Sequence, residues 1–341
     1  MLREQDVGHR IVVRRRVGLR AGRPVYADAL GELVELTETH LTLATRKGRL
    51  RVPMADVHRA KRVPAARRPT AAAVVEVELA ADEAWPAPTR ERLGDWLLRA
   101  ADGWTGRANS ALPVGDPDRP LPAALDRVER WYAERGQPAL VNTPLPLAAP
   151  VGAELDRRGW SSRPPVLVQT APIASLTGPG SRTNGQPGTT GGPAAGGAGG
   201  PVVRLTVAPS ADWLAVAAGR KGGLPAAARH VLTAVDQVRF AHVYADGTLV
   251  AIGRGTVTGQ GRWLGLCLIE VLPAARRQGL AARLVGALAD WAAETGATHA
   301  FLQVEQGNVP AVALYQNLGF TTHHTYLTRV APLTNHQPAP I

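Results

Sequence analysis

The apolar positions toward the C-terminus form two kinds of pattern in alternation. Residues 266–272 are almost all apolar, which suits one buried strand, and Pro273 ends that strand because proline cannot donate to the ladder. A helical stripe follows at Leu280, Leu284 and Leu288. Residues 300–304 repeat the strand pattern and residues 309–318 the helical one. The spacing therefore predicts strand, turn, helix, strand and helix.

The segment before this pattern continues the alternation back to residue 202. Its predicted elements are a strand at 202–207, helices at 210–218 and 225–233, a hairpin of strands at 238–244 and 248–257, and a strand at 263–272. The hairpin prediction depends on Ala245-Asp246-Gly247, a tight-turn sequence. Together with the C-terminal pattern, residues 202–318 are therefore predicted to follow the order β-α-α-β-β-β-α-β-α.

The N-terminal segment has a different pattern, with short alternating runs separated by turn formers. We expect strands at residues 9–15, 29–36, 40–45, 49–53 and 57–63. Lys47-Gly48 predicts a tight hairpin, whereas Gly18, Gly22 and Pro24 predict a longer loop. Five short strands in so few residues are typical of an SH3-like small barrel, assigned to residues 1–65.

The middle of the chain mixes helical and strand patterns. We expect a connector at 64–84 with one strand at 73–79, helices at 89–100, 121–135 and 151–158, and strands at 139–142 and 166–170. Residues 176–200 consist mostly of Gly, Pro, Ser and Thr, so they predict a flexible linker. On that basis we expect the segments on either side to be separate folding units, or at least separate sub-domains.

Composition adds charge to this picture. The chain has 341 residues with 45% hydrophobic and 20% charged residues, as in ordinary globular proteins of more than one domain. Its formal net charge is +11, and residues 1–68 hold sixteen Arg and Lys against seven Asp and Glu, a net charge of +9. This excess suggests an acidic or nucleic-acid partner for the N-terminal segment. Because Tyr26 is its one Phe, Tyr or Trp residue, a docking or structural role is the competing interpretation.

Two classes of protein are disfavoured by the sequence. Cys267 is the one cysteine and lies in an apolar run, so we interpret it as a core thiol rather than part of a disulfide framework. The charged N-terminus does not resemble a signal peptide, and no apolar run has membrane-spanning length. We therefore expect a cytoplasmic protein without membrane or metal partners.

The turn after Pro273 carries the clearest candidate chemistry. Arg276-Arg277-Gln278-Gly279-Leu280-Ala281 places two arginines and a glycine directly before a predicted helix. Free N–H groups at the helix start, the helix dipole and the arginines all favour an anion, so this turn predicts a phosphate site. Farther along, Asn308 is placed to cap the helix at 309–318.

Two motifs together resemble the GNAT family of acyl-CoA-dependent N-acyltransferases. Arg276-x-x-Gly279-x-Ala281 is similar to the pyrophosphate loop of that family, and the run from Asn308 to Phe320, N-x-x-A-x-x-L-Y-x-x-x-G-F, is similar to its second cofactor motif. The resemblance implies an α+β fold with a catalytic GNAT domain at 201–332 and acetyl-CoA as acyl donor.

The resemblance extends less completely to the rest of the chain. Residues 85–175 resemble a degenerate GNAT-like half, with Gly159-Trp160 in the place of Gly319-Phe320 and without a pyrophosphate loop. An unrelated α/β connector is the alternative. The N-terminal barrel resembles one found in an actinobacterial subset of the family.

The resemblance also implies roles for individual residues. Backbone N–H groups around Ile269 and Val271 would polarise the thioester carbonyl and pair with the pantetheine arm, and Tyr315 would protonate the departing thiolate. The residues implied to bind the cofactor are Ile269, Val271, Arg276, Arg277, Gln278, Gly279, Leu280, Ala281, Asn308 and Tyr315. Gln303 stands where several family members have a catalytic glutamate, which leaves Glu270, Glu305 or ordered water to take the amine proton.

Two functions remain open at this point. One is acetyl transfer to a primary amine of a small-molecule, peptide or protein acceptor that the sequence does not identify. The other is a catalytically weak CoA-binding sensor or interaction protein. The loops at 218–225 and 107–113 are expected to form the acceptor pocket, with Asn109 and Ser110 as candidate contacts.

Overall fold

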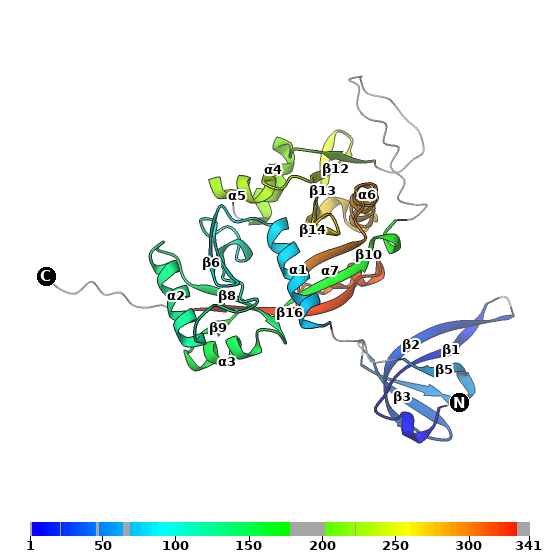
Figure 1. Cartoon of the computed structure of the whole chain (residues 1–341). Helices are drawn as coiled ribbons and strands as arrows, with labels where there is room; N and C mark the ends of the chain where they lie inside the picture. Colours follow the sequence, from blue (N-terminus) through cyan, green and yellow to red (C-terminus); the bar gives the residue numbers. More distant parts are fainter. Residues whose placement is uncertain are drawn as a thin grey trace. The chain divides into compact units, whose positions relative to one another are not determined.

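The computed structural model describes residues 2–20, 22–45, 48–63, 69–177, 202–221 and 223–332 (Figure 1). The chain divides into two compact units, Met1–Arg68 and Pro69–Ile341. The predicted linker at 176–200 lies, except for its first two residues, outside the described part of the chain. Within the described ranges, no helix is both long and apolar enough to cross a membrane.

The first unit contains five antiparallel strands, as the sequence predicts. They are β1 (Arg10–Arg20), β2 (Arg23–Leu36), β3 (His40–Thr45), β4 (Gly48–Pro53) and β5 (Val57–Arg62), in the sheet order β4-β3-β2-β1-β5. Alternate apolar residues such as Ile11, Val13 and Leu33 are fully buried in its core. The longer loop expected at Gly18–Pro24 is wrong, because β1 and β2 stay paired until Arg20 lies opposite Arg23.

The second unit is built on one large mixed sheet. Nine described strands form it: β8 (Leu140–Leu145), β9 (Ser161–Ser162), β10 (Val166–Pro172), β11 (Val203–Thr206), β12 (Val238–Ala245), β13 (Thr248–Thr258), β14 (Trp263–Val271), β15 (His299–Glu305) and β16 (Thr321–Val330). The order is β11-β12-β13-β14-β15-β10-β16-β8, with β9 beside β16. From β11 onward, the predicted sequence of elements is confirmed.

The middle segment, residues 69–177, and the C-terminal segment, residues 202–332, share this sheet. β10 lies between β15 and β16 and pairs antiparallel with both, and β8 pairs with the other side of β16. Both ladders satisfy the backbone of β10, so its apolar face can be fully buried, with Val168 in the core. The expectation of two separate folding units is therefore wrong.

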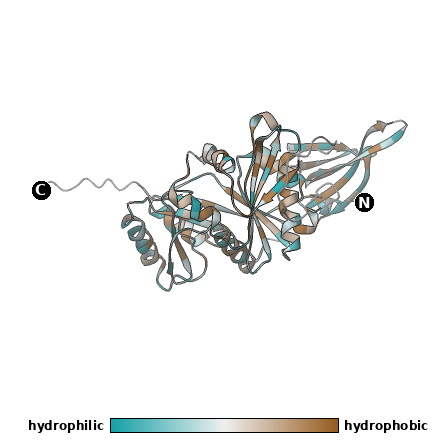
Figure 2. Cartoon of the chain, turned by 90° about the horizontal axis from the view of Figure 1, so that it is seen from above, coloured by the Kyte–Doolittle hydropathy of each residue, from teal (hydrophilic) through white to brown (hydrophobic). Residues whose placement is uncertain are grey.

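Helices cover both faces of the sheet. α6 (Leu280–Glu294) and α7 (Val309–Asn317) lie on one face, where Leu284, Leu288 and Tyr315 join the largest apolar core. α1 (Ala71–Ala84) packs on the other face against Val168 and Tyr326. Hydrophobic positions recur along the strands between these layers (Figure 2). The remaining helices are α2 (Leu121–Ala133), α3 (Ala149–Arg157), α4 (Ala211–Lys221) and α5 (Ala226–Thr233).

Two elements of the middle segment differ from the sequence prediction. The strand expected at 73–79 is part of α1, which Thr70 caps by accepting a hydrogen bond from the amide of Ala73. Its alanine-rich composition favours helix. The helix expected at 89–100 is a hairpin of β6 (Thr89–Leu93) and β7 (Trp96–Ala100), because Gly94 has a positive φ of 57° and closes a tight turn.

Candidate active site

The central feature of the second unit is a place where two parallel strands separate. β14 and β15 pair from Trp263 opposite His299 as far as Leu266 opposite Leu302, and the ladder stops there. Leu268 has a φ of +51°, and the register of β14 against β13 shifts at the same point. A bulge in β14 thus bends it away from β15 and opens the sheet.

A cavity of about 490 Å³ occupies this opening. Leu302 and Val304 in its wall belong to the core on the α6 side, whereas Tyr326 belongs to the core under α1. The cavity therefore connects the two faces of the sheet through the splayed strands. Its lining comes from β14, β15, α7, β16 and the loops before β10, including Leu266, Cys267, Leu268, Ile269, Gln303, Glu305, Asn308, Ala311 and Tyr315.

The predicted phosphate-binding turn has the expected geometry. β14 ends, a short 3-10 turn runs over Pro273–Ala275, and α6 begins after Gly279. Arg277 and Gly279 have positive φ values of 67° and 75°, and no side chain caps α6. The first amides of α6 therefore lack partners within the helix, in an exposed basic turn. Leu280 differs from its neighbours, because its side chain is buried in the core.

Arg276 has a more local role than its neighbours in the turn. Its Nε donates a hydrogen bond to the carbonyl of Val271 at 3.1 Å, and its guanidinium lies 4.0 Å from the carboxylate of Glu270. Both contacts hold the turn against the end of β14. The exposed side chains of Arg277 and Gln278 are placed beside the uncapped helix start instead.

The second motif brings Asn308 and Tyr315 to the cavity. Asn308 accepts a hydrogen bond from the amide of Ala311 at 3.3 Å and so caps α7, as the sequence predicts. Farther along α7, Tyr315 is 9% exposed and packs edge-on against Phe320 at 5.9 Å between ring centroids. The cap fixes the start of α7, and thereby the position from which Tyr315 enters the cavity wall.

The two candidate carboxylates occupy different places. Glu305 lies in the cavity wall, whereas Glu270 is not among the lining residues and faces Arg276. Gln303 accepts a hydrogen bond from the Tyr326 hydroxyl at 3.3 Å. Burial of that hydroxyl raises the pKa of Tyr326, against the opposing effect of the nearby Arg107 guanidinium. Tyr326 therefore stays a neutral hydrogen-bond donor.

Part of the lining comes from the middle segment and was missed by sequence reasoning. Trp85, Thr105, Arg107 and Arg163 of the middle segment line the cavity, and so do Tyr326 and Thr328 of β16. Only Arg107 fell within a predicted acceptor loop. The position of β10 in the sheet brings the others to the site, and no local motif carries that information.

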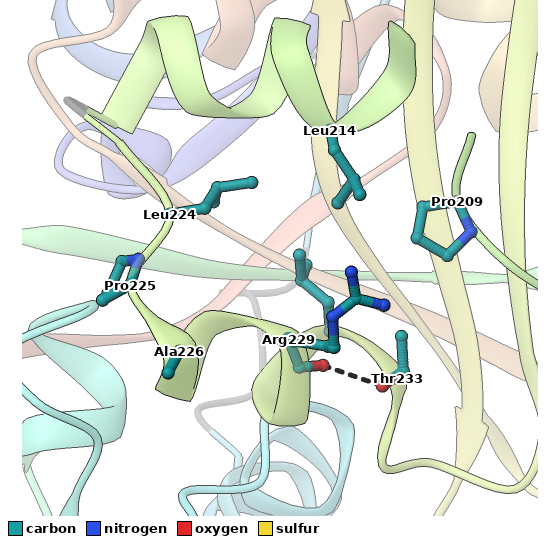
Figure 3. A pocket seen from close by; sticks show the side chains of 8 residues that line it. Pro209, Leu214, Leu224, Pro225, Ala226, Arg229 and Thr233 are labelled. Atoms are coloured by element: carbon teal, nitrogen blue, oxygen red, sulfur yellow. Dashed lines mark hydrogen bonds between the residues drawn. The ribbon is translucent and has the colours of Figure 1, made fainter. Parts of the chain in front are cut away.

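The other candidates from the acceptor loops do not line this cavity. Asn109 is buried and accepts hydrogen bonds from the amides of Ala101 and Gly103 at 2.8 and 3.0 Å, so it holds its own loop together. Ser110 bonds to the buried Arg99. The loop at 218–225 borders a separate hollow of about 270 Å³ between α4 and α5 (Figure 3), which shares no lining residue with the cavity.

Comparisons with known proteins agree with this geometry. A family model described as "Probable histone acetyltransferase Rv0428c C-terminal" matches residues 71–328. The chain is 28% identical to an uncharacterized N-acetyltransferase, YobR, of Bacillus subtilis, over 74% of this chain and 98% of that protein. It is 29% identical to the probable histone acetyltransferase Rv0428c of Mycobacterium tuberculosis, over 93% of each. A GCN5-related N-acetyltransferase from Kribbella flavida has a similar fold, with a TM-score of 0.56 at 18% identity over 79% of this chain and 98% of its own.

Proposed function

Because the chain belongs to the family of the Rv0428c C-terminal region and is a GNAT-type N-acetyltransferase, we propose that the splayed strands hold acetyl-CoA and that the cavity behind them holds a primary amine. The opening of β14 from β15 into a cavity that reaches Tyr315 carries this proposal. It accounts for a bulge that otherwise only removes hydrogen bonds from a central sheet.

The donor half of the site would be held by backbone groups. The amides of Arg277 to Ala281 meet the pyrophosphate at the start of α6, with charge from the exposed Arg277. The pantetheine arm then follows the unpaired edge of β14. Ile269 lies in the bulge and lines the cavity, whereas Val271 remains in register with Ala251 of β13. We therefore assign the contact with the thioester carbonyl to the peptide groups around Ile269.

The reaction forms a carbon–nitrogen bond, breaks the carbon–sulfur bond and transfers two protons. The lone pair of the neutral amine forms the new bond to the acetyl carbon, the carbon–sulfur bond breaks, and the thiolate leaves. Tyr315 donates the proton to that thiolate from the cavity wall. Glu305 is the carboxylate at the cavity that can take the amine proton, and Glu270 supports the pyrophosphate turn through Arg276 instead.

The test measures donor binding and turnover separately. Calorimetry with coenzyme A should show binding, and release of free thiol from acetyl-CoA in the presence of an amine panel should report transfer. Tyr315→Phe should keep CoA affinity and lose roughly a hundredfold in kcat, the usual size of a general-acid contribution. No CoA binding would sink the proposal. Binding without turnover of any amine would favour the sensor interpretation.

The acceptor is a further question. The name of the mycobacterial relative suggests the amine of a basic protein as one candidate. The charges on the cavity wall favour a different class of amine.

A further inference from the structure

Two arginines of the middle segment lie on the acceptor side of the cavity. Arg107 begins a 3-10 turn after β7, and Arg163 follows β9. A terminal nitrogen of Arg163 lies 2.7 Å from the point where a Cβ on Gly106 would stand. The Arg163 guanidinium therefore rests over the Gly106 backbone, next to Arg107, and the missing side chain at Gly106 makes that position possible.

Neither arginine is neutralised by the protein. Among the described residues, no ion pair joins either guanidinium to a carboxylate, and the buried Nε of Arg107 has no hydrogen-bond partner. Arg107 as a whole is half-buried, whereas the fully buried arginines of this unit are satisfied. Arg99 pairs with Asp82 and donates to the Ser110 carbonyl, and Arg254 donates to the carbonyls of Leu232 and Ala84. A buried guanidinium donor without a partner is costly, so the Arg107 side of the cavity is suited to an anion.

The cavity is also lined by a carboxylate and by hydroxyl groups. Glu305 supplies one negative charge to the same cavity, and it lies on β15, which also contributes to the thioester side. Tyr326 and Thr105 place hydroxyl groups near the arginines. Glu305 lies opposite Val166, close in sequence to Arg163. Two positive charges and a carboxylate in one cavity would match a molecule that carries both a negative group and an amine.

We propose that the acceptor is an amine that also carries a carboxylate, as a free amino acid does. This proposal rests on the proposed acetyl transfer. Arg107 and Arg163 bind the carboxylate, since guanidinium groups pair with carboxylates through two parallel hydrogen bonds. The amine lies toward Glu305 and the acetyl group. The products are the N-acetyl amino carboxylate and coenzyme A.

The decisive experiment measures binding rather than turnover. The full-length protein is saturated with coenzyme A and titrated with a panel of N-acetyl-L-amino acids, each compared with its own uncharged N-acetyl-L-amino acid amide. At least one acid should bind about ten- to a hundredfold more tightly than its amide, the range for a hydrogen-bonded charge at a partly buried site. If no acid in the panel binds more tightly than its amide, the proposal is wrong.

Variants assign the effect to the arginines. Arg107→Gln and the more exposed Arg163→Gln should each reduce the preference for the acid while CoA affinity is unchanged, which also shows that the variant is folded. Arg119→Gln, an exposed arginine away from the cavity, should leave the preference intact. A preference that survives both cavity variants would overturn the assignment.

Turnover measurements distinguish the carboxylate site from the proposed acetyl transfer on which it rests. With L-amino acids, L-amino acid amides and a lysine-rich peptide as acceptors, the acids should have the highest kcat/KM. Faster transfer to the amides or to the peptide would refute the carboxylate site and leave the acetyltransferase function standing. A failure to bind coenzyme A would refute both.

Discussion

Two loops of the second unit follow a strand and precede a helix, yet they use their backbone amides in opposite ways. The loop after β14 leaves the first amides of α6 uncapped in an exposed turn. The loop after β7 instead gives its amides at Ala101 and Gly103 to the buried side chain of Asn109. The first arrangement suits an anionic ligand, whereas the second consumes its own donors and presents side chains, among them Arg107, to the cavity.

The difference shows how the two substrates are recognised. The proposed donor site consists largely of backbone groups in one continuous stretch of the C-terminal segment. The proposed acceptor site consists of side chains from the middle segment, held by buried hydrogen bonds. Substitutions in the two loops should therefore have separable effects on stability and on CoA binding.

The largest effect is expected from Asn109→Ala. It removes the acceptor for two amides and the donor to the Thr105 carbonyl, all in or near the protein interior. Unsatisfied buried groups cost about 1–3 kcal/mol each, so the free energy of unfolding should fall by roughly 2–5 kcal/mol in urea titrations. Asn308→Ala, which removes one exposed cap, should cost only about 1 kcal/mol. Equal losses in the two variants would contradict the comparison.

A smaller effect on stability, with a specific effect on binding, is expected from Gly279→Ala. Gly279 has a φ of +75° with open space around its Cα, so alanine adds backbone strain of about 1–2 kcal/mol without a clash. The strain should shift the amides at the start of α6 and weaken coenzyme A binding, measured by calorimetry. Gly136→Ala is the matched control, since Gly136 has a φ of +61° and the same open surroundings near the end of α2. It should lose similar stability and keep full CoA affinity.

The smallest effect concerns the pH dependence of stability that arises from His242 in β12. Burial lowers the pKa of His242, whose ring bonds to the Phe240 carbonyl and the Ser210 hydroxyl and lies near Arg204 and Asp212. The folded state therefore resists its protonation. Its contribution to stability is complete above the unfolded pKa of 6.5 and is lost as the pH falls below that value. Thermal unfolding between pH 7.5 and 5 should show this decline, and His242→Gln should flatten it.

The C-terminal elements could be predicted from the sequence because each depends on local information. Pro273 ends a strand, Gly279 starts a helix and Asn308 caps one, and the structure has all three. The acceptor side could not be predicted in this way. The strand expected at 73–79 lies within α1, and Asn109 was expected to contact the acceptor although it binds its own loop. Only the second error concerns tertiary packing, because the alanine-rich composition of α1 is local information that favours helix.

The place of β10 in the sheet also constrains how the chain is made. When residue 177 has been synthesised, β8 and β10 still lack the strands that pair with them, since β15 and β16 are not yet made. The exposed edges of both strands must wait for about 150 further residues before they are covered. Synthesis of β16 thus adds the last strand of the sheet and the last strand that lines the cavity.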